Sequence, residues 1–380
     1  MEIGSAIISR VIYLDHNATT PVLPEVFETM VPYFRNEWGN PSSTYRFGSK
    51  LKSVIEAARM QVAELIGARP SEIVFTSGAT EANNAAINAA LRANPSKRHI
   101  VTSAAEHSSV LAYCHALEKD GYRVSYLGVN RDGLLSLKEL ESAISKDTAL
   151  VSLMWANNET GVLFPVAEVA HLCREHGVLF HCDSVQAIGK VSVDVRELPA
   201  DYLSIAGHKL GAPKGVGALF VRRKAPFRPF IYGGHQESGR RGGTESVGFA
   251  VALGAACAIA ARRLSDYDRR VRPLRDFLEE GILGAVPGTG LNGHKTLRIG
   301  NTSNISFDGL ESEALLMLLD ERKVCASAGS ACLADSQETS HVIAAKGTLS
   351  ARPGWGARRA LSFVRNFLGF DTDSSRSCAK

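Results

Sequence analysis

Short apolar runs alternate with helix-like stretches along the first 220 residues. Seven runs are rich in Val, Ile, Leu, Phe and Tyr and have the length of strands. These runs lie at 73–75, 99–102, 124–127, 149–154, 178–181, 202–205 and 217–221. Stretches with helical spacing stand between most of them, at 79–93, 109–120, 137–144 and 166–176. The alternation, with its short connections, predicts an α/β domain with a mostly parallel sheet.

The last third of the chain has a different pattern. A long helical stretch covers about 246–280, and a shorter one covers 311–320. Strand-like segments at 298–307 and 324–325 lie on either side of the shorter helix. This region predicts a second, smaller α/β domain.

Composition agrees with two domains in a globular protein. A chain of 380 residues is longer than one small core needs. We expect a large domain over 15–260 and a small domain formed by 1–14 and 261–380. With 45% hydrophobic and 22% charged residues, the chain has the balance of a soluble protein. The net charge of +4 comes from mostly dispersed Lys and Arg, which argues against nucleic-acid binding.

The cysteines and the apolar runs bear on the compartment. No charged and then apolar signal pattern opens the chain, and no apolar run approaches the ~18 residues that span a bilayer. Seven cysteines are widely spread, without a Cys-x-x-Cys pair, which favours a reducing compartment and argues against a structural zinc site. We therefore expect a cytoplasmic protein without a membrane segment or a bound metal.

Polar residues follow the predicted strands. Thr76, His107, Asn158, Asp183 and Lys209 all lie just past strand ends. Ligands of parallel sheets bind at the carboxyl ends of the strands, so these five side chains are expected to share one site. An acid, an aromatic base, a phosphate-type turn and a lysine are the parts needed to hold pyridoxal phosphate (PLP).

Each of these residues also has a structural alternative. The turn at 76–80 can bind a phosphate through helix N–H groups, or its hydroxyls can simply cap the helix. His107 can stack on a flat ring or exchange protons, or it can be structural. Asp183 can hold a pyridine nitrogen protonated, or it can form a salt bridge or cap a helix. Gln186 is within reach of the same ligand. Lys209 can be a nucleophile or a solvated lysine.

A run of small residues at 327–336 contains Cys332. A cysteine in such a loop is a candidate nucleophile, and an inert cysteine is the alternative. Cys325 lies in a predicted strand and is expected to be inert. Four other cysteines are expected to be small core residues, and these are Cys114, Cys173, Cys182 and Cys257.

Eight short motifs, taken in order, resemble one family. They are YLDHNATT at 13–20, NPSS at 40–43, FTSGATE at 75–81, NNE at 157–159, GHK at 207–209, GGHQE at 233–237, RGGT at 241–244 and SAGSAC at 327–332. The ordered set spans about residues 11–346 and is similar to the cysteine desulfurases of the NifS/IscS type. These are PLP enzymes of fold type I in the class V aminotransferase group. The NifS branch, which is linked to nitrogenase maturation, looks most similar.

The resemblance implies a fold and an activity. The fold would be a fold-type I PLP-dependent transferase, with a large domain around a mostly parallel sheet and a smaller α/β C-terminal domain. The activity would be conversion of L-cysteine to L-alanine, with the sulfur held as a persulfide on Cys332 and passed to an iron–sulfur scaffold protein. The Cys332 sulfur is also a candidate ligand for an iron–sulfur cluster in transit. Members of the family are homodimers with the site at the subunit interface.

The resemblance also implies a role for each motif residue. Lys209 would link covalently to PLP, Asp183 would pair with the pyridinium nitrogen, Gln186 with the ring hydroxyl, and His107 would stack on the ring. Asn158 would contact the substrate. The phosphate would be held by Ala79, Thr80, Ala206, Gly207 and His208, together with the partner subunit's Thr244.

Two departures from the family pattern stand out. The family often has Ser where this chain has Ala206. From about residue 347 the chain also lacks the expected apolar-Arg-x-Ser-x-Gly-Arg strand. Counting from Ser340 puts Arg358 at the place of the arginine that binds the substrate carboxylate.

Two alternatives stay open: another PLP enzyme that does not need Cys332, and a non-catalytic partner protein.

Overall fold

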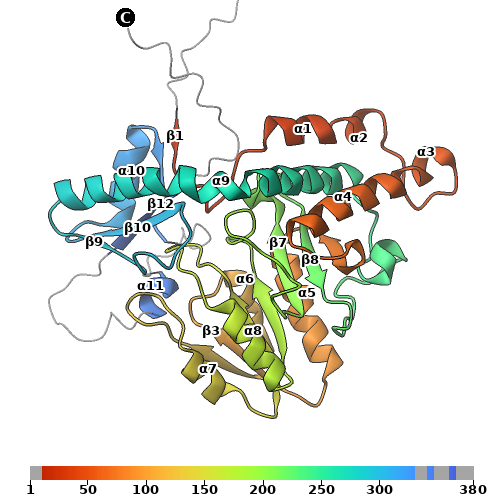
Figure 1. Ribbon diagram of the computed structural model, residues 1–380, viewed down its shortest axis with the longest axis horizontal. Helices are drawn as coiled ribbons and strands as arrows, with labels where there is room; N and C mark the ends of the chain where they lie inside the picture. The colour runs from red at the N-terminus through yellow and green to blue at the C-terminus, as the bar shows by residue number, and fades with distance from the viewer. Residues whose placement is uncertain (1–10, 330–339, 346–358, 365–380) are drawn as a thin grey trace, which may run out of the picture.

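The computed structural model describes residues 11–329, 340–345 and 359–364. A seven-stranded sheet lies at the centre of the part of the structure formed by residues 73–221, with helices on both faces (Figure 1). In spatial order its strands are β2 (Ile73–Thr76), β8 (Gly217–Val221), β7 (Tyr202–Ala206), β6 (Leu179–Asp183), β5 (Thr148–Met154), β3 (His99–Ser103) and β4 (Arg123–Leu127). β8 runs antiparallel to both neighbours, whereas the strands from β7 to β4 are parallel. The seven predicted strands and the mostly parallel sheet are confirmed.

The sheet is buried on both faces because its side chains alternate between two hydrophobic cores. Val101 of β3 belongs to the core beneath α7 and α8, and its neighbour Ile100 belongs to the core beneath α5 and α6. The helices that supply these cores are α5 (Ala79–Ala93), α6 (Ser108–Lys119), α7 (Leu137–Ala143) and α8 (Val166–Glu175). Their bounds agree with the predicted helices to within one residue.

A helix of 39 residues, α9 (Val247–Ala285), runs along the top of the sheet (Figure 1). It packs against α1 (Pro24–Met30) and α4 (Leu51–Leu65). By length and composition α9 could cross a membrane, so the expectation that no such run exists was wrong. More than half of its apolar window is buried against the protein, as in the core helix of a soluble protein. The short helices α2 (Pro32–Arg35) and α3 (Arg46–Ser49) complete this layer.

Beyond α9 the chain builds a second, smaller sheet. Its strands are β12 (Arg359–Val364), β10 (Thr302–Phe307) and β9 (Thr289–Leu291), in that order and all antiparallel. The helices α10 (Ser312–Glu321) and α11 (His341–Ala345) belong to the same region. The predicted strand at 324–325 is confirmed as β11 (Val324–Cys325), but it pairs in parallel with β1 (Ile12–Tyr13) at the start of the chain. The predicted strand at 298–307 begins later, at Thr302.

His181 makes the fold sensitive to acid. It is fully buried in β6, where Nδ1 lies 2.8 Å from Ser152 Oγ and Nε2 lies 2.9 Å from Ser204 Oγ. Burial lowers the pKa of His181 to about 4. The unfolded chain takes up this proton near pH 6.5, whereas the folded chain does so only near pH 4, so the unfolded state binds more protons between these values.

We therefore expect the free energy of unfolding to fall as pH drops from 6.5 towards 4, by about 1.4 kcal/mol per pH unit for this residue. Urea unfolding at a series of pH values measures the slope. His181→Asn should reduce the slope by about that amount. An unchanged slope in the His181 variant would contradict the assignment.

Candidate active site

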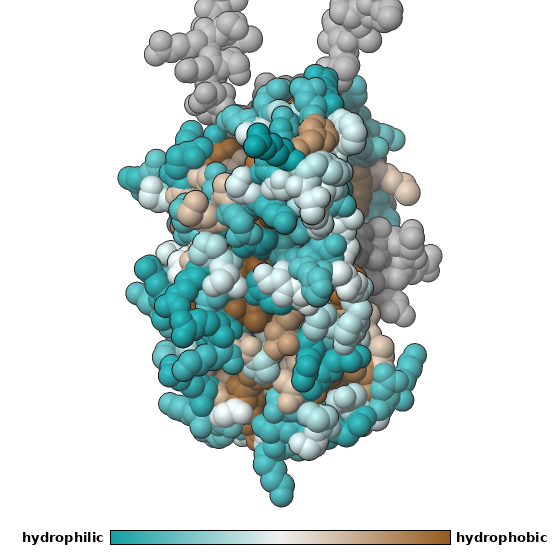
Figure 2. All heavy atoms as spheres, turned by 90° about the vertical axis from the view of Figure 1, so that its right-hand side faces the viewer, coloured by the Kyte–Doolittle hydropathy of each residue, from teal (hydrophilic) through white to brown (hydrophobic). Residues whose placement is uncertain are grey.

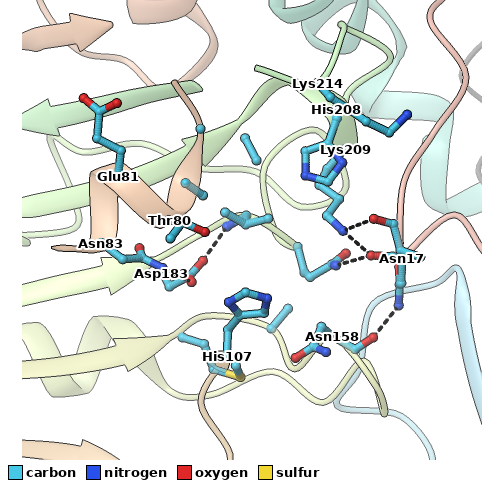
Figure 3. A pocket seen from close by; sticks show the side chains of 18 of the residues that line it. Asn17, Thr80, Glu81, Asn83, His107, Asn158, Asp183, His208, Lys209 and Lys214 are labelled. Atoms are coloured by element: carbon cyan, nitrogen blue, oxygen red, sulfur yellow. Dashed lines mark hydrogen bonds between the residues drawn. The ribbon is translucent and has the colours of Figure 1, made fainter. Parts of the chain in front are cut away.

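A cavity of about 430 Å³ opens at the carboxyl ends of the parallel strands. This volume lies in the range of small-molecule sites, roughly 300–1,000 Å³. Nine of the sequence-predicted residues line it: Ala79, Thr80, His107, Asn158, Asp183, Gln186, Ala206, His208 and Lys209. In Figure 3, Lys209 and Asn17 lie on one side, Asp183 and Asn83 on the other, and His107 between them. Four of the five side chains expected from the strand ends, His107, Asn158, Asp183 and Lys209, line this cavity. The fifth, Thr76, lines a smaller adjoining cavity instead.

The N-terminus of α5 forms one end of the cavity. Its cap residue is Gly78, and no side chain caps the helix. The alternative that Thr76 or Ser77 is only a helix cap is therefore wrong; Thr76 Oγ1 instead donates to the carbonyl of Gly78 at 3.0 Å. A Cβ at Gly217 would lie 2.8 Å from the Cα of Gly78, so the two backbones meet closely here. Ala79 and Thr80 of its first turn line the cavity, and the N–H groups at a helix N-terminus suit an anion.

Asp183 ends β6 and is almost fully buried. Its Oδ2 accepts a hydrogen bond from Asn83 Nδ2 at 2.8 Å, and its Oδ1 accepts one from the N–H of Val185 at 3.1 Å. Within the described residues it has no ion pair, so the salt-bridge alternative is not observed. A buried carboxylate of this kind can bind a cationic or N–H group of a ligand.

His107 follows β3 and caps α6. Its Nδ1 accepts a hydrogen bond from the N–H of Ser109 at 3.1 Å. Burial lowers the pKa of His107, so the ring is neutral at pH 7 with its proton on Nε2. The structural alternative is therefore observed, since His107 caps α6, and the residue also lines the cavity.

Lys209 closes the short 3₁₀ turn after β7. Its Nζ donates to the main-chain carbonyls of Asn17 and, at 2.7 Å, of Ala18. The neighbouring His208 accepts at its carbonyl from the N–H of Thr20 at 3.0 Å. Burial, with a contribution from Lys209 and Lys214, lowers the pKa of His208 to about 4. The N-terminal segment thus holds the amine of Lys209 at the cavity wall.

Some predicted residues lie elsewhere. Gly207 is buried behind the lining, where a Cβ would meet Val216 at 2.9 Å. Thr244 is exposed and lines a smaller, adjoining cavity that shares Ser77, Gly215 and Val216 with the first. Cys332 and Arg358 lie outside the described residues.

Sequence reasoning missed three residues of the lining that matter. Asn83 lies one turn beyond Thr80 on α5, and that spacing could have revealed it. Asn17 lies in the motif at 13–20, but nothing in its spacing points to the cavity. Glu81 forms an ion pair with Arg241 at 3.0 Å, which links the cavity to the loop that carries Thr244.

Comparison with known proteins agrees with this geometry. The family model described as "Aminotransferase class-V" matches residues 12–353. Cysteine desulfurase 2 of Trichormus variabilis is 52% identical over 337 residues, which cover 89% of this chain and 84% of the relative. The cysteine desulfurase NifS of Azotobacter vinelandii is 46% identical over 335 residues, covering 88% and 83%.

Solved structures share the fold. A protein described as NifS-like superimposes with a TM-score of 0.87 at 34% identity and covers 94% of each chain. A structure described as SspA in complex with cysteine gives a TM-score of 0.81 at 35% identity, covering 93% of this chain and 98% of that one. Because the family model and the relatives each cover nearly nine-tenths of the sequence, the chain belongs to the class V aminotransferase family.

Proposed function

We propose that the protein is a PLP-dependent cysteine desulfurase. It would convert L-cysteine to L-alanine and pass the sulfur, as a persulfide on Cys332, to an iron–sulfur scaffold protein. The observation that carries the proposal is the cavity in which the Lys209 amine, the Asp183 carboxylate and the N-terminus of α5 converge, with Gly329 at its wall. The curated relatives named cysteine desulfurase support the same activity.

The residues present fit PLP. The N-terminus of α5, with Ala79 and Thr80, would hold the phosphate. Asp183, fixed by Asn83, would face the pyridine nitrogen, and the neutral ring of His107 would stack on the cofactor. The Oδ1 of Asn83 is buried without a partner among the described residues, which leaves an acceptor open to a ligand. When bound, PLP supplies an electron-accepting ring that stabilises negative charge at the substrate Cα.

Lys209 and Asn158 would act on the substrate. The Lys209 amine would link to the cofactor and, once cysteine displaces it, take the proton from the substrate Cα. Asn158 lines the same cavity, and its main chain is fixed because its carbonyl accepts from Asn17 Nδ2 at 2.9 Å. Asn158 would contact the substrate, and Arg358 would bind the substrate carboxylate.

The sulfur step depends on the reach of Cys332. Gly329 lines the cavity, and Ser327 is held there because its hydroxyl donates to Asp15 Oδ1. Cys332 is three residues beyond Gly329, and three extended residues span at most about 11 Å. Its thiolate would attack the sulfur of cysteine. An S–S bond forms and the C–S bond breaks, with the electron pair staying on the carbon skeleton, which leaves as alanine after protonation.

The proposal includes a homodimer. Thr244 is exposed beside the cavity, which suits a residue that completes the phosphate site of a partner subunit. Apolar side chains are exposed among polar ones on the side of the molecule that carries α3 and α4 (Figure 2). Two aromatic side chains just before α3 in the chain, Trp38 and Tyr45, are 70% and 59% exposed. A second copy would cover them.

The remaining parts of the proposal concern architecture and setting. Residues 15–260 would form the cofactor domain, and 1–14 with 261–380 the small domain. The enzyme would act in the cytoplasm, in iron–sulfur assembly linked to nitrogenase. A different PLP reaction on the same fold would not need Cys332, so this cysteine separates the alternatives.

Sulfide and alanine should form together, in equal amounts, from L-cysteine and the PLP-loaded protein in the presence of a thiol reductant. Cys332→Ala should bind PLP and cysteine but release no sulfide, since no thiolate remains to accept the sulfur. In protein treated with L-cysteine without a reductant, mass spectrometry of the peptide at 324–346 should show one extra sulfur in the wild type only.

Cys325→Ala is the matched control. Cys325 lies in β11, so its replacement should leave turnover within about twofold of the wild type. Full activity of the Cys332 variant would point to another PLP reaction. Absence of sulfide from the wild type would favour a non-catalytic partner protein.

Lys209 should carry the cofactor. Borohydride reduction of the PLP-loaded protein, followed by denaturation and peptide mapping, should place the pyridoxyl label on Lys209, because its amine is the one held at the cavity wall. Lys209→Ala should take up PLP without retaining a label. Lys214→Ala, which removes the other lysine of the lining, should keep the label, and a label on Lys214 in the wild type would show the assignment to be wrong.

Arg358 should bind the substrate carboxylate. A bidentate guanidinium holds a carboxylate better than an ammonium does. Arg358→Lys should therefore weaken cysteine binding by roughly 1.5–3 kcal/mol, the scale of a hydrogen bond to a charged group. Titration of cysteine by the change in visible absorbance measures it, and the absorbance without cysteine should be unchanged. Arg359→Lys is the control. Unaltered cysteine binding by the Arg358→Lys variant would show that Arg358 does not bind the substrate carboxylate.

A further inference from the structure

Lys190 is a buried lysine without a part in the chemistry above. It lies in the loop after β6, is 5% exposed, and forms no ion pair within the described residues. Its Nζ donates a hydrogen bond to Gln186 Oε1 at 2.7 Å. Burial lowers its pKa to about 7, and the nearby charge of Lys209 adds to the effect. Burying an ammonium without an opposite charge costs free energy, so packing alone does not explain why a lysine occupies this position.

The loop is shaped to bring Lys190 to this place. Gly189, just before it, has a φ of +74°, a conformation that L side chains rarely adopt. A Cβ at Gly189 would also lie 2.7 Å from Leu210. The turn therefore lies tightly against the segment that follows Lys209 and directs the Lys190 side chain back over Gln186.

Gln186 lies between two groups of opposite kind. On one side is Lys190, which in its ammonium form can only donate. On the other side is the main-chain carbonyl of Asn17, which can only accept, and which receives Gln186 Nε2 at 3.1 Å. The same carbonyl accepts from Lys209 Nζ. A flipped amide would put N–H against the ammonium and oxygen against the carbonyl, so both neighbours enforce one orientation.

We propose that Lys190 is a positioning residue of this site, whose ammonium fixes the Gln186 amide with Nε2 towards the cavity and the Asn17 carbonyl. Gln186 then presents only its Nε2–H donor to the ring oxygen of PLP. The site therefore favours the form of PLP whose ring oxygen accepts a hydrogen bond. Lys190 does not touch the ligand and acts through Gln186. The inference rests on PLP as the proposed cofactor.

The test is PLP binding to the apoprotein, measured by equilibrium dialysis, together with the visible spectrum of the bound cofactor. In Lys190→Met the dissociation constant for PLP should rise about tenfold, the scale of one hydrogen bond, and the visible band should shift. The melting temperature of the apoprotein should stay the same or rise, because a buried lone ammonium is removed. A structural role would lower the melting temperature and leave the band in place.

A double-mutant cycle tests the route through Gln186. In a Gln186→Leu background, Lys190→Met should change the dissociation constant less than twofold. The same tenfold loss in both backgrounds would overturn the proposal. Lys190→Gln keeps a neutral hydrogen-bond donor, so its dissociation constant for PLP should lie between those of the wild type and Lys190→Met. This variant replaces Lys190→Met in the test if the methionine variant does not fold.

Lys146→Met, at an exposed position, is the matched control and should leave affinity and spectrum unchanged. If the wild type does not bind PLP, the proposed cofactor fails. If the wild type binds PLP and both Lys190→Met and Lys190→Gln match its affinity and spectrum, only the role of Lys190 fails.

Discussion

The hydrogen bonds of Asn17 tie together the parts of the molecule that form the cavity. Its carbonyl accepts from Lys209 and Gln186, so the N-terminal segment sets the position of both side chains. Its Nδ2 donates to the carbonyl of Asn158 after β5 and, at 3.0 Å, to Thr302 Oγ1 at the start of β10. One buried residue thereby joins the cavity lysine, the large sheet and the small sheet. Movement of the small region against the cavity has to break these bonds, which links its position to the state of the site.

The large sheet could be predicted from sequence because its strands are buried on both faces and appear as continuous apolar runs. The segment 24–65 gave no such signal, since α1 and α4 are stabilised by packing on α9, more than 180 residues away in sequence. β1 and β11 have two residues each and pair across about 310 positions. Strands that short carry no periodicity, and only long-range pairing defines them.

The site was predictable to the extent that topology alone brings residues together. Asp183 and Lys209 follow parallel strands, and the carboxyl ends of such strands meet at one edge. The same argument could not find Asn17, because the position of the N-terminal segment against β7 depends on tertiary contacts such as that between Thr20 and the carbonyl of His208. Nor could it find the role of Lys190, since a lone lysine in sequence is most often solvated.

Burial decides which groups near the cavity keep a charge. Glu106 is fully buried beside His107, and burial, with a contribution from Asp183, raises its pKa to about 8. Its Oε1 accepts from Ser103 Oγ at 2.8 Å and from the N–H of Met154 at 3.0 Å, so the neutral acid still fixes the backbone around it. A protonated Glu106 adds no negative charge beside Asp183, and a neutral His107 adds no positive charge. Desolvation thus limits the charge that Glu106 and His107 bring to the surroundings of Asp183.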